Sequence, residues 1–258
     1  MWPDGDPNYT RVMSGLYRDE GVVLRTIKLG EADRIVTIFT QGHGKIRAVA
    51  KGVRKTTSRF GARLEPASHV ALQCYKGREL DVVTQVETIE SNRAVREGYA
   101  MFTHAVPMLE VVDHVTPERD PNAALYRMLT GALRTLGTRR SALVTTAFFW
   151  KLLSLEGFQP MLDGCARCGA GTGGADGDDI VLPAFDLADG GMLCESCAAL
   201  SGRMVSPAAL DLLRRLLGGG LNGALAEPPG PVTREVERLG LASVEFHLER
   251  RLRSATLL

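Results

Sequence analysis

The chain has 258 residues, 45% of them apolar, and its 31 Lys and Arg nearly balance 30 Asp and Glu, for a net charge of +1. This composition fits one large or two to three small folded domains and excludes a chain that is disordered throughout. Because the total charge is so small, any binding to nucleic acid must come from a local basic patch. No apolar run reaches the ~18 residues of a membrane span, and residues 1–14 lack the features of a signal peptide. We therefore expect a cytoplasmic protein with a flexible extension over residues 1–14.

Five short runs rich in β-branched residues follow one another between residues 20 and 86, separated by brief turns. Five strands in so short a segment favour a closed barrel, of which the oligonucleotide/oligosaccharide-binding (OB) fold is the common five-stranded case. An SH3-like barrel and a meander sheet fit the same pattern. The predicted strands are Val22–Ile27, Arg34–Thr40, Lys45–Ala50, Ser68–Tyr75 and Leu80–Val86.

The segment Gly44–Leu64 carries seven cations, and no Asp or Glu occurs between Gln41 and Leu64. Each Lys or Arg that neutralises a phosphate also releases condensed counterions, so such a segment suits a polyanion. The hydroxyl groups of this segment can donate to phosphate, and Phe60 offers an aromatic face for base stacking. The alternative is an ordinary solvated loop. The seven cations are Lys45, Arg47, Lys51, Arg54, Lys55, Arg59 and Arg63.

Beyond Ser91 the apolar residues recur at helical spacing. Tyr99–Val115 is helical in composition, but Pro107 predicts a kink or a break. Asp120 and Pro121 predict a helix start, and the helix is expected to end at Gly137. Three further helices are predicted over Ser141–Glu156, after the cap Ser206, and from Thr233, the last with Leu241, Val244, Leu248 and Leu252 on one face.

Four of the five cysteines form two Cys-x-x-Cys pairs that are separated by twenty-five residues. Two such turns can close a tetrahedron of thiolates around one metal ion, with Zn–S near ~2.3 Å. Zinc is the favoured ion, and four thiolates leave no open position, so its role would be structural. Disulfides, redox-active pairs and an iron–sulfur cluster are the alternatives. The predicted ligands are Cys165, Cys168, Cys194 and Cys197, whereas Cys74 is expected in a protein core.

Residues for catalysis are not apparent in the sequence. It contains no HExxH, no GxSxG elbow and no P-loop, and Asp176–Asp179 lacks the spacing of a calcium loop. We therefore predict that the protein is not an enzyme and has no small-molecule substrate. The five histidines are expected to have surface or packing roles; they are His43, His69, His104, His114 and His247.

Several sequence strings together resemble the bacterial recombination-mediator family RecO, in its zinc-containing members. The resemblance covers the chain after its first fourteen residues. It implies an α+β multidomain protein with an OB-fold barrel over residues 15–91 and an α-helical domain over 92–258, into which a four-cysteine zinc module, 158–200, is inserted. The strings that carry it are Tyr17–Lys55, Ser58–Pro66, Gly157–Pro160 and Gly190–Cys194.

The resemblance also implies a function, partners and a nucleoid-associated location in the cytoplasm. RecO proteins bind single- and double-stranded DNA, anneal complementary strands without nucleotide hydrolysis, and help to load recombinase onto DNA that is covered by single-strand binding protein. They act with RecR and in some cases with RecF. The residues expected to face DNA are Arg25, Lys28, Arg34, Lys45, Arg47, Lys51, Arg54, Lys55, Arg59, Arg63 and the stacking residue Phe60.

RecO proteins also recognise the acidic C-terminal tail of single-strand binding protein through a basic and apolar patch on the helical domain. The residues expected to supply it here are Arg127, Arg134, Arg139 and Arg140, with a solvated bundle face as the alternative. Two other functions fit parts of the sequence. One is a protein-interaction adaptor whose basic loop binds an acidic partner. The other is a zinc hydrolase, which a site closed by four thiolates argues against.

Overall fold

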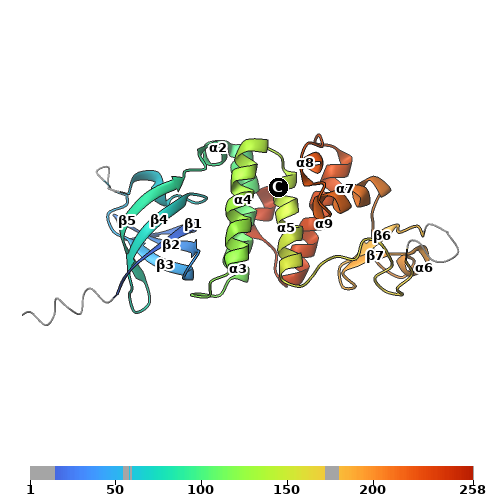
Figure 1. The fold of residues 1–258 in the computed structure, drawn as a ribbon, viewed down its shortest axis with the longest axis horizontal. Helices are drawn as coiled ribbons and strands as arrows, with labels where there is room; N and C mark the ends of the chain where they lie inside the picture. Colours follow the sequence, from blue (N-terminus) through green and yellow to red (C-terminus); the bar gives the residue numbers. More distant parts are fainter. Residues whose placement is uncertain (1–14, 55–57, 59, 172–179, 258) are drawn as a thin grey trace, which may run out of the picture. The chain divides into compact units, whose positions relative to one another are not determined.

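The computed structural model describes residues 15–54, 58, 60–171 and 180–257. The chain divides into two compact units, residues 1–137 and 138–258 (Figure 1). The predicted extension over residues 1–14 lies outside the described residues, and the predicted domain boundaries stay predictions. Among the described helices, none has both the length and the apolar composition that a membrane crossing requires.

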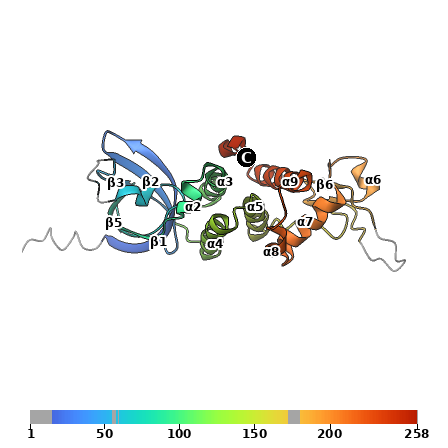
Figure 2. The same cartoon turned by 90° about the horizontal axis from the view of Figure 1, so that it is seen from above.

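The five strands of the first unit form a closed barrel of order β1-β2-β3-β5-β4 (Figures 1 and 2). Four of the five strand pairings are antiparallel, and the pairing of β3 with β5 is parallel. The first strand is long enough to pair with β4 through its first half and with β2 through its second half. This closed five-stranded arrangement confirms the prediction of an OB fold. The strands are β1 (Leu16–Leu29), β2 (Asp33–Thr40), β3 (Gly44–Ala50), β4 (His69–Tyr75) and β5 (Asp81–Glu90).

Side chains along each strand point alternately into and out of the barrel, and the inward-facing ones fill its interior. The short 3-10 helix η1 (Gly61–Leu64) follows β3, and Phe60 and Leu64 at its two ends add their side chains to this core. Cys74 also lies inside, with none of its surface exposed, as predicted. Burial raises the pKa of this thiol to about 12, so it stays protonated at neutral pH.

A buried carboxylate lies where the barrel closes. The side chain of Asp81, at the start of β5, is completely buried. It accepts hydrogen bonds from the hydroxyl of Tyr17 on β1, from the backbone N–H of Gly77 at 3.0 Å and from Nη2 of Arg119 at 2.7 Å. Burial and the Asp81 carboxylate raise the pKa of Tyr17 far above its usual range, so the hydroxyl remains a donor. The carboxylate thus joins two strands to the segment that contains Arg119.

Three helices complete the first unit: α2 (Arg93–Arg96), α3 (Tyr99–Val115) and the larger part of α4 (Ala123–Arg139). The last two run side by side (Figures 1 and 2). The carboxylate of Asp113 on α3 forms an ion pair with Nε of Arg25 of β1 at 2.6 Å and another with Nζ of Lys45 of β3 at 3.3 Å. These two pairs hold α3 against the barrel.

Two helix predictions are wrong in part. Of the kink or break predicted at Pro107, the break does not occur: α3 continues through this residue, whose buried side chain packs in the interior, and this packing outweighs the lost hydrogen bond. The helix α4 begins at Ala123 instead of Pro121, because the side chain of Asn122 caps it by accepting from the N–H of Leu125 at 2.9 Å. It also continues past Gly137, where glycine costs only ~1 kcal/mol.

The second unit is built on three helices, α5 (Leu143–Leu155), α7 (Pro207–Leu217) and α9 (Pro231–His247), with the short α8 (Leu221–Ala224) and η2 (Arg253–Leu257) beside them. Almost every residue of α5 is buried, as its all-round apolar sequence predicts.

Local sequence explains how these helices begin and pack. Ser206 caps α7 as predicted, by accepting from the N–H of Ala209. A Cβ at Gly240 would lie 3.0 Å from the indole nitrogen of Trp150, so this glycine lets α9 approach α5 closely. The helix α9 ends at His247, so the predicted face that included Leu248 and Leu252 is too long.

The Asp81 cluster predicts the effect of one substitution. Replacing Arg119 with alanine leaves a buried carboxylate without its cation, which costs ~3–5 kcal/mol for a fully buried pair. Because Arg119 itself reaches solvent, we expect a loss of about 2 kcal/mol in the free energy of unfolding, measured by urea denaturation. Arg93→Ala is the matched control, since its ion pair with Glu97 is exposed and should leave the urea midpoint unchanged. Equal midpoints for both variants would contradict the role of Arg119.

A buried histidine predicts pH dependence. Burial and the nearby Arg134 lower the pKa of His69, although Glu20 and Glu90 act in the opposite direction. The unfolded chain therefore binds a proton more readily than the folded one, so stability is complete above pH ~6.5 and falls as the pH drops toward the folded pKa. His69→Gln can keep the hydrogen bond to Tyr126 and should reduce the stability difference between pH 7.5 and pH 5.5 in urea denaturation. An unchanged difference would count against this assignment.

Candidate metal centre and nucleic-acid interface

Residues between α5 and α7 form a small cysteine-bearing module. Its three-stranded sheet has the order β7-β6-β8 and consists of β6 (Ala184–Asp186), β7 (Gly191–Leu193) and β8 (Arg203–Met204). The hairpin of β6 and β7 is the one that the sequence predicts, and its second strand leads directly into Cys194. The short helix α6 (Glu195–Ala198) then presents Cys197.

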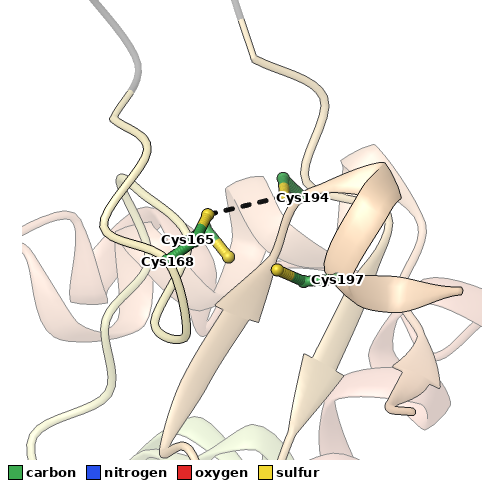
Figure 3. A group of neighbouring side chains, drawn as sticks. All are labelled: Cys165, Cys168, Cys194 and Cys197. Atoms are coloured by element: carbon green, nitrogen blue, oxygen red, sulfur yellow. Dashed lines mark hydrogen bonds between the residues drawn. The ribbon is translucent and has the colours of Figure 1, made fainter. Parts of the chain in front are cut away.

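The four cysteines of the two pairs lie together (Figure 3). Their sulfur atoms are all within 4.8 Å of one another, and Sγ of Cys168 lies 3.8 Å from Sγ of Cys194. A tetrahedral site with metal–sulfur bonds of ~2.3 Å requires sulfur atoms ~3.8 Å apart. The geometry therefore suits one metal ion held by Cys165, Cys168, Cys194 and Cys197.

Hydrogen bonds from the backbone favour the thiolate form of one cysteine of the cluster. Burial of Cys165 opposes its ionisation, but backbone N–H groups of Cys168, Cys194 and Arg167 donate to its sulfur and lower its pKa. Burial and the neighbouring thiols raise the pKa of Cys197. The thiols of the cluster therefore differ in how readily they lose their protons, and a divalent metal ion would displace the remaining protons on binding.

The side chain of Arg167, inside the first pair, ties the module together. It makes an ion pair with Asp189 in the β6–β7 turn at 2.7 Å and donates to the carbonyl oxygen of Cys197 at 3.1 Å. It also donates to Ser201 at 2.6 Å, whose hydroxyl in turn donates to Asp186. One guanidinium therefore connects both cysteine turns and the hairpin without a metal ion.

Seven of the ten predicted DNA-facing cations divide into two groups. Four of them lie next to carboxylates in the first unit: Arg25 and Lys45 pair with Asp113 as described, Arg34 pairs with Glu65 at 2.7 Å, and Arg47 lies 3.9 Å from Glu118. Lys45 is also largely buried. These contacts make Arg25 and Lys45 structural links between the barrel and α3.

The second group, Lys28, Lys51 and Arg54, is exposed and has no carboxylate partner among the described residues. Arg54 donates to the carbonyl of Gly30 at 3.2 Å, and its own N–H donates to the carbonyl of Ala32 at 3.0 Å. These bonds hold the chain after β3 against the β1–β2 turn. Lys28 lies opposite Arg34 in the β1–β2 pair, and Arg34 lies opposite Ala50, the residue before Lys51. The three cations are therefore at the same end of the barrel as the exposed Glu31 of the β1–β2 turn.

The remaining residues of the predicted basic loop have different fates. Lys55 and Arg59 lie outside the described residues, and Arg63 is exposed on η1. The hypothesis that Phe60 stacks on a base is wrong for this conformation. Its ring is only 1% exposed, because it is more stable in the barrel core than it would be at the surface.

Sequence reasoning missed two cations of the β4–β5 turn, Lys76 and Arg78. Both are exposed, and neither has a carboxylate partner in the part of the chain that the structure describes. The turn itself depends on Gly77, because a Cβ there would lie 1.8 Å from the carbonyl oxygen of Leu80. Turns between the first two and the last two strands commonly flank the binding face of an OB fold, and this topological rule is the signal that could have found them.

The four arginines predicted to bind a partner lie on α4 or directly after it. Arg127, Arg134 and Arg139 lie along α4, and Arg140 follows it; all four are exposed. Arg134 pairs with Glu90 of β5 at 3.2 Å, and Arg139 donates to Asn222 at 3.3 Å. The assignment of these four residues to a partner stays a prediction.

Comparisons with known proteins agree over nearly the whole chain. The family model described as "Recombination protein O N terminal" matches residues 13–92, and the one described as "Recombination protein O C terminal" matches residues 96–256. A protein of Frankia casuarinae named "DNA repair protein RecO" is 44% identical over 243 residues, which cover 93% of this chain and 96% of the relative. A protein of the same name from Streptomyces coelicolor is 43% identical over 253 residues, covering 93% of this chain and 97% of the relative.

The metal centre predicts a stoichiometry. We expect one tightly bound metal ion per chain, measured by inductively coupled plasma mass spectrometry after purification without added metal. Cys168→Ser or Cys194→Ser should remove it, because three thiolates leave the tetrahedron incomplete. Cys74→Ala is the matched control, since Cys74 is the one cysteine outside the cluster and should leave the metal content unchanged. Full metal content in the Cys194 variant would contradict the four-cysteine site.

Proposed function

Because the chain belongs to the RecO family of DNA repair proteins, we propose that it is a recombination mediator that binds single- and double-stranded DNA and anneals complementary strands without nucleotide hydrolysis. The observation that carries this proposal is the group Lys28, Lys51 and Arg54 on one end of an OB-fold barrel. In a chain with a net charge of +1, such a group is the local basic patch that DNA binding requires.

Annealing follows from electrostatics. Two complementary strands repel each other through their phosphates, and cations that bind both backbones reduce this repulsion and raise the local strand concentration. Contacts to phosphate carry no sequence information, so the same surface serves any pair of complementary strands. Base pairing then supplies the free energy, which is why no nucleotide needs to be hydrolysed.

We propose that DNA binds to the basic surface of the barrel. The centre of this surface is the group Lys28, Lys51 and Arg54. The other residues assigned to it are Lys55, Arg59 and Arg63 of the basic segment, Arg34 and Arg47 of β2 and β3, and Lys76 and Arg78 of the β4–β5 turn. Arg25 and Lys45 are positioning residues that hold α3 on the barrel through Asp113.

We further propose that the metal ion is zinc, bound for structure. Four thiolates are the ligand set of structural zinc sites, and they leave no position for water or substrate. The module that they hold has only two short strands and a two-residue edge strand, too little to form a core by itself. Zinc binding would therefore contribute to folding of the module rather than to any chemistry.

In its cellular role the protein would help to load recombinase onto DNA covered by single-strand binding protein, together with RecR and in some organisms RecF. The acidic tail of single-strand binding protein would bind at the exposed arginines Arg127, Arg134, Arg139 and Arg140. Family membership supports these partners, and positive charge on α4 suits an acidic tail.

The experiment is annealing of two complementary fluorescent oligonucleotides by the purified protein, without nucleotide, over a salt series. We expect acceleration at low salt that fades steeply as salt rises. The triple variant Lys28→Gln, Lys51→Gln, Arg54→Gln should bind single strands more weakly, and the slope of log K against log salt should fall by ~2, because each lost phosphate contact removes ~0.7.

The matched control replaces three exposed arginines of the second unit, Arg203, Arg238 and Arg251, by glutamine, which changes the net charge by the same amount. This control should keep the wild-type slope. If the folded, metal-loaded wild-type protein fails to accelerate annealing at low salt, the proposal is wrong, and an adaptor that binds an acidic protein becomes the better explanation.

A further inference from the structure

A basic hollow lies on the first unit, where Arg63 of the basic segment meets two arginines from outside that segment. It has a volume of about 410 Å³ and lies between η1, the end of β5 and α2. Three arginines line it, Arg63, Arg93 and Arg96, together with the hydroxyl residues Ser68, Thr88 and Ser91. Glu97 is the one carboxylate among its lining residues. The hollow therefore carries a net positive charge and several hydroxyl groups.

The guanidinium of Arg96 is fixed in place by neutral groups. Its Nη1 donates to the hydroxyl of Ser68 at 3.1 Å and to the carbonyl oxygen of Ser91 at 3.3 Å. No carboxylate of the described residues pairs with Arg96. An arginine that is held by neutral acceptors keeps its full charge and needs little reordering to bind a phosphate through two hydrogen bonds.

The backbone around Arg96 is held in an uncommon conformation. Ala67, next to Ser68, has φ +67°, and Asn92, next to Ser91, has φ +46°, and both are left-handed without being glycine. The buried side-chain amide of Asn92 donates to the carbonyl oxygen of Ala67 at 2.8 Å, so each strained residue supports the other. Left-handed non-glycine residues are energetically unfavourable and tend to occur where a site needs a fixed geometry. Here they fix the two acceptors that orient Arg96.

The hollow also continues the basic segment of the sequence. Phe60 and Arg63 belong to that segment and line the hollow, whereas Lys51 and Arg54 lie in its other described part, directly after β3. A strand of nucleic acid that contacts both parts would meet cations at each.

We propose that this hollow, centred on Arg96, binds a phosphate of the nucleic-acid backbone and is a second anchor for a single strand. The proposal deepens the proposed function, since it adds a phosphate site to the same interface. Arg96 would hold the phosphate through its guanidinium, with Arg93 and the hydroxyl groups around it, while Glu97 weakens binding because it occupies Arg93 at 2.7 Å.

The test measures binding of a fluorescent single-stranded oligonucleotide to the full-length protein by anisotropy, over a salt series. Arg96→Gln should weaken binding several-fold at low salt and lower the salt slope by ~0.7, the value for one phosphate contact. Arg238→Gln, an exposed arginine of the second unit, is the matched control and should leave both quantities unchanged. An Arg96→Gln protein with wild-type affinity and slope would overturn the proposal.

A second variant is expected to bind more tightly, and a gain in binding cannot result from damage to the fold. Glu97→Gln should strengthen oligonucleotide binding about two- to three-fold, because it releases Arg93 and removes the negative charge of Glu97 from the hollow. An effect of this size corresponds to the free energy of one exposed ion pair. Glu156→Gln, an exposed glutamate of the second unit, controls for the change in net charge. Equal gains in both variants would overturn the site.

Inorganic phosphate separates this proposal from the proposed function. At constant ionic strength, phosphate should raise the melting temperature of the wild-type protein and of Arg238→Gln more than that of Arg96→Gln. Equal stabilisation of all three overturns the hollow as a phosphate site. A wild-type protein that binds phosphate through Arg96 but binds no oligonucleotide refutes the proposed function and the role of the hollow as a DNA anchor, while the anion site itself stands.

Discussion

Burial of one carboxylate, that of Asp81, is the constraint on which the first unit depends. The barrel closes where β3 and β5 pair in parallel, and that pairing covers only two residue pairs, Ala48 with Asp81 and Val49 with Val82. So short a ladder adds little by itself. A buried carboxylate costs several kcal/mol unless donors surround it. Tyr17, Gly77 and Arg119 are those donors, so the closure of the barrel and the position of the α3–α4 connection are fixed together.

The same principle of matched charge divides the basic residues between structure and function. Asp113 on α3 takes up Arg25 and Lys45, and these pairs hold the helix against the barrel. Lys28, Lys51 and Arg54 have no such partner among the described residues and remain exposed. The neighbouring carboxylates thus decide which cations of the barrel are paired and which stay exposed without a carboxylate partner among the described residues.

The cysteine module relies on polar contacts as well as on buried apolar side chains such as Phe185, Met192 and Leu193. Its backbone N–H groups point at the sulfur of Cys165, and Arg167 joins the hairpin turn to both cysteine pairs. Such polar contacts orient the thiols in the way that outer groups orient metal ligands in general. The module can therefore be small and still hold four sulfur atoms at tetrahedral spacing.

The sequence by itself determined the five strands, the cysteine cluster and the buried Cys74, because alternation, turn residues and Cys-x-x-Cys spacing are local signals that survive in any context. It could not determine the start of α4, where Asn122 competes with Asp120 as the cap, or the continuation of α3 through Pro107, which packing permits. Only the tertiary structure showed that Phe60 belongs to the core and that Arg25 and Lys45 have carboxylate partners. It also brought Arg96 to Ser68, because burial and pairing between distant residues depend on which segments meet, and no local pattern records that.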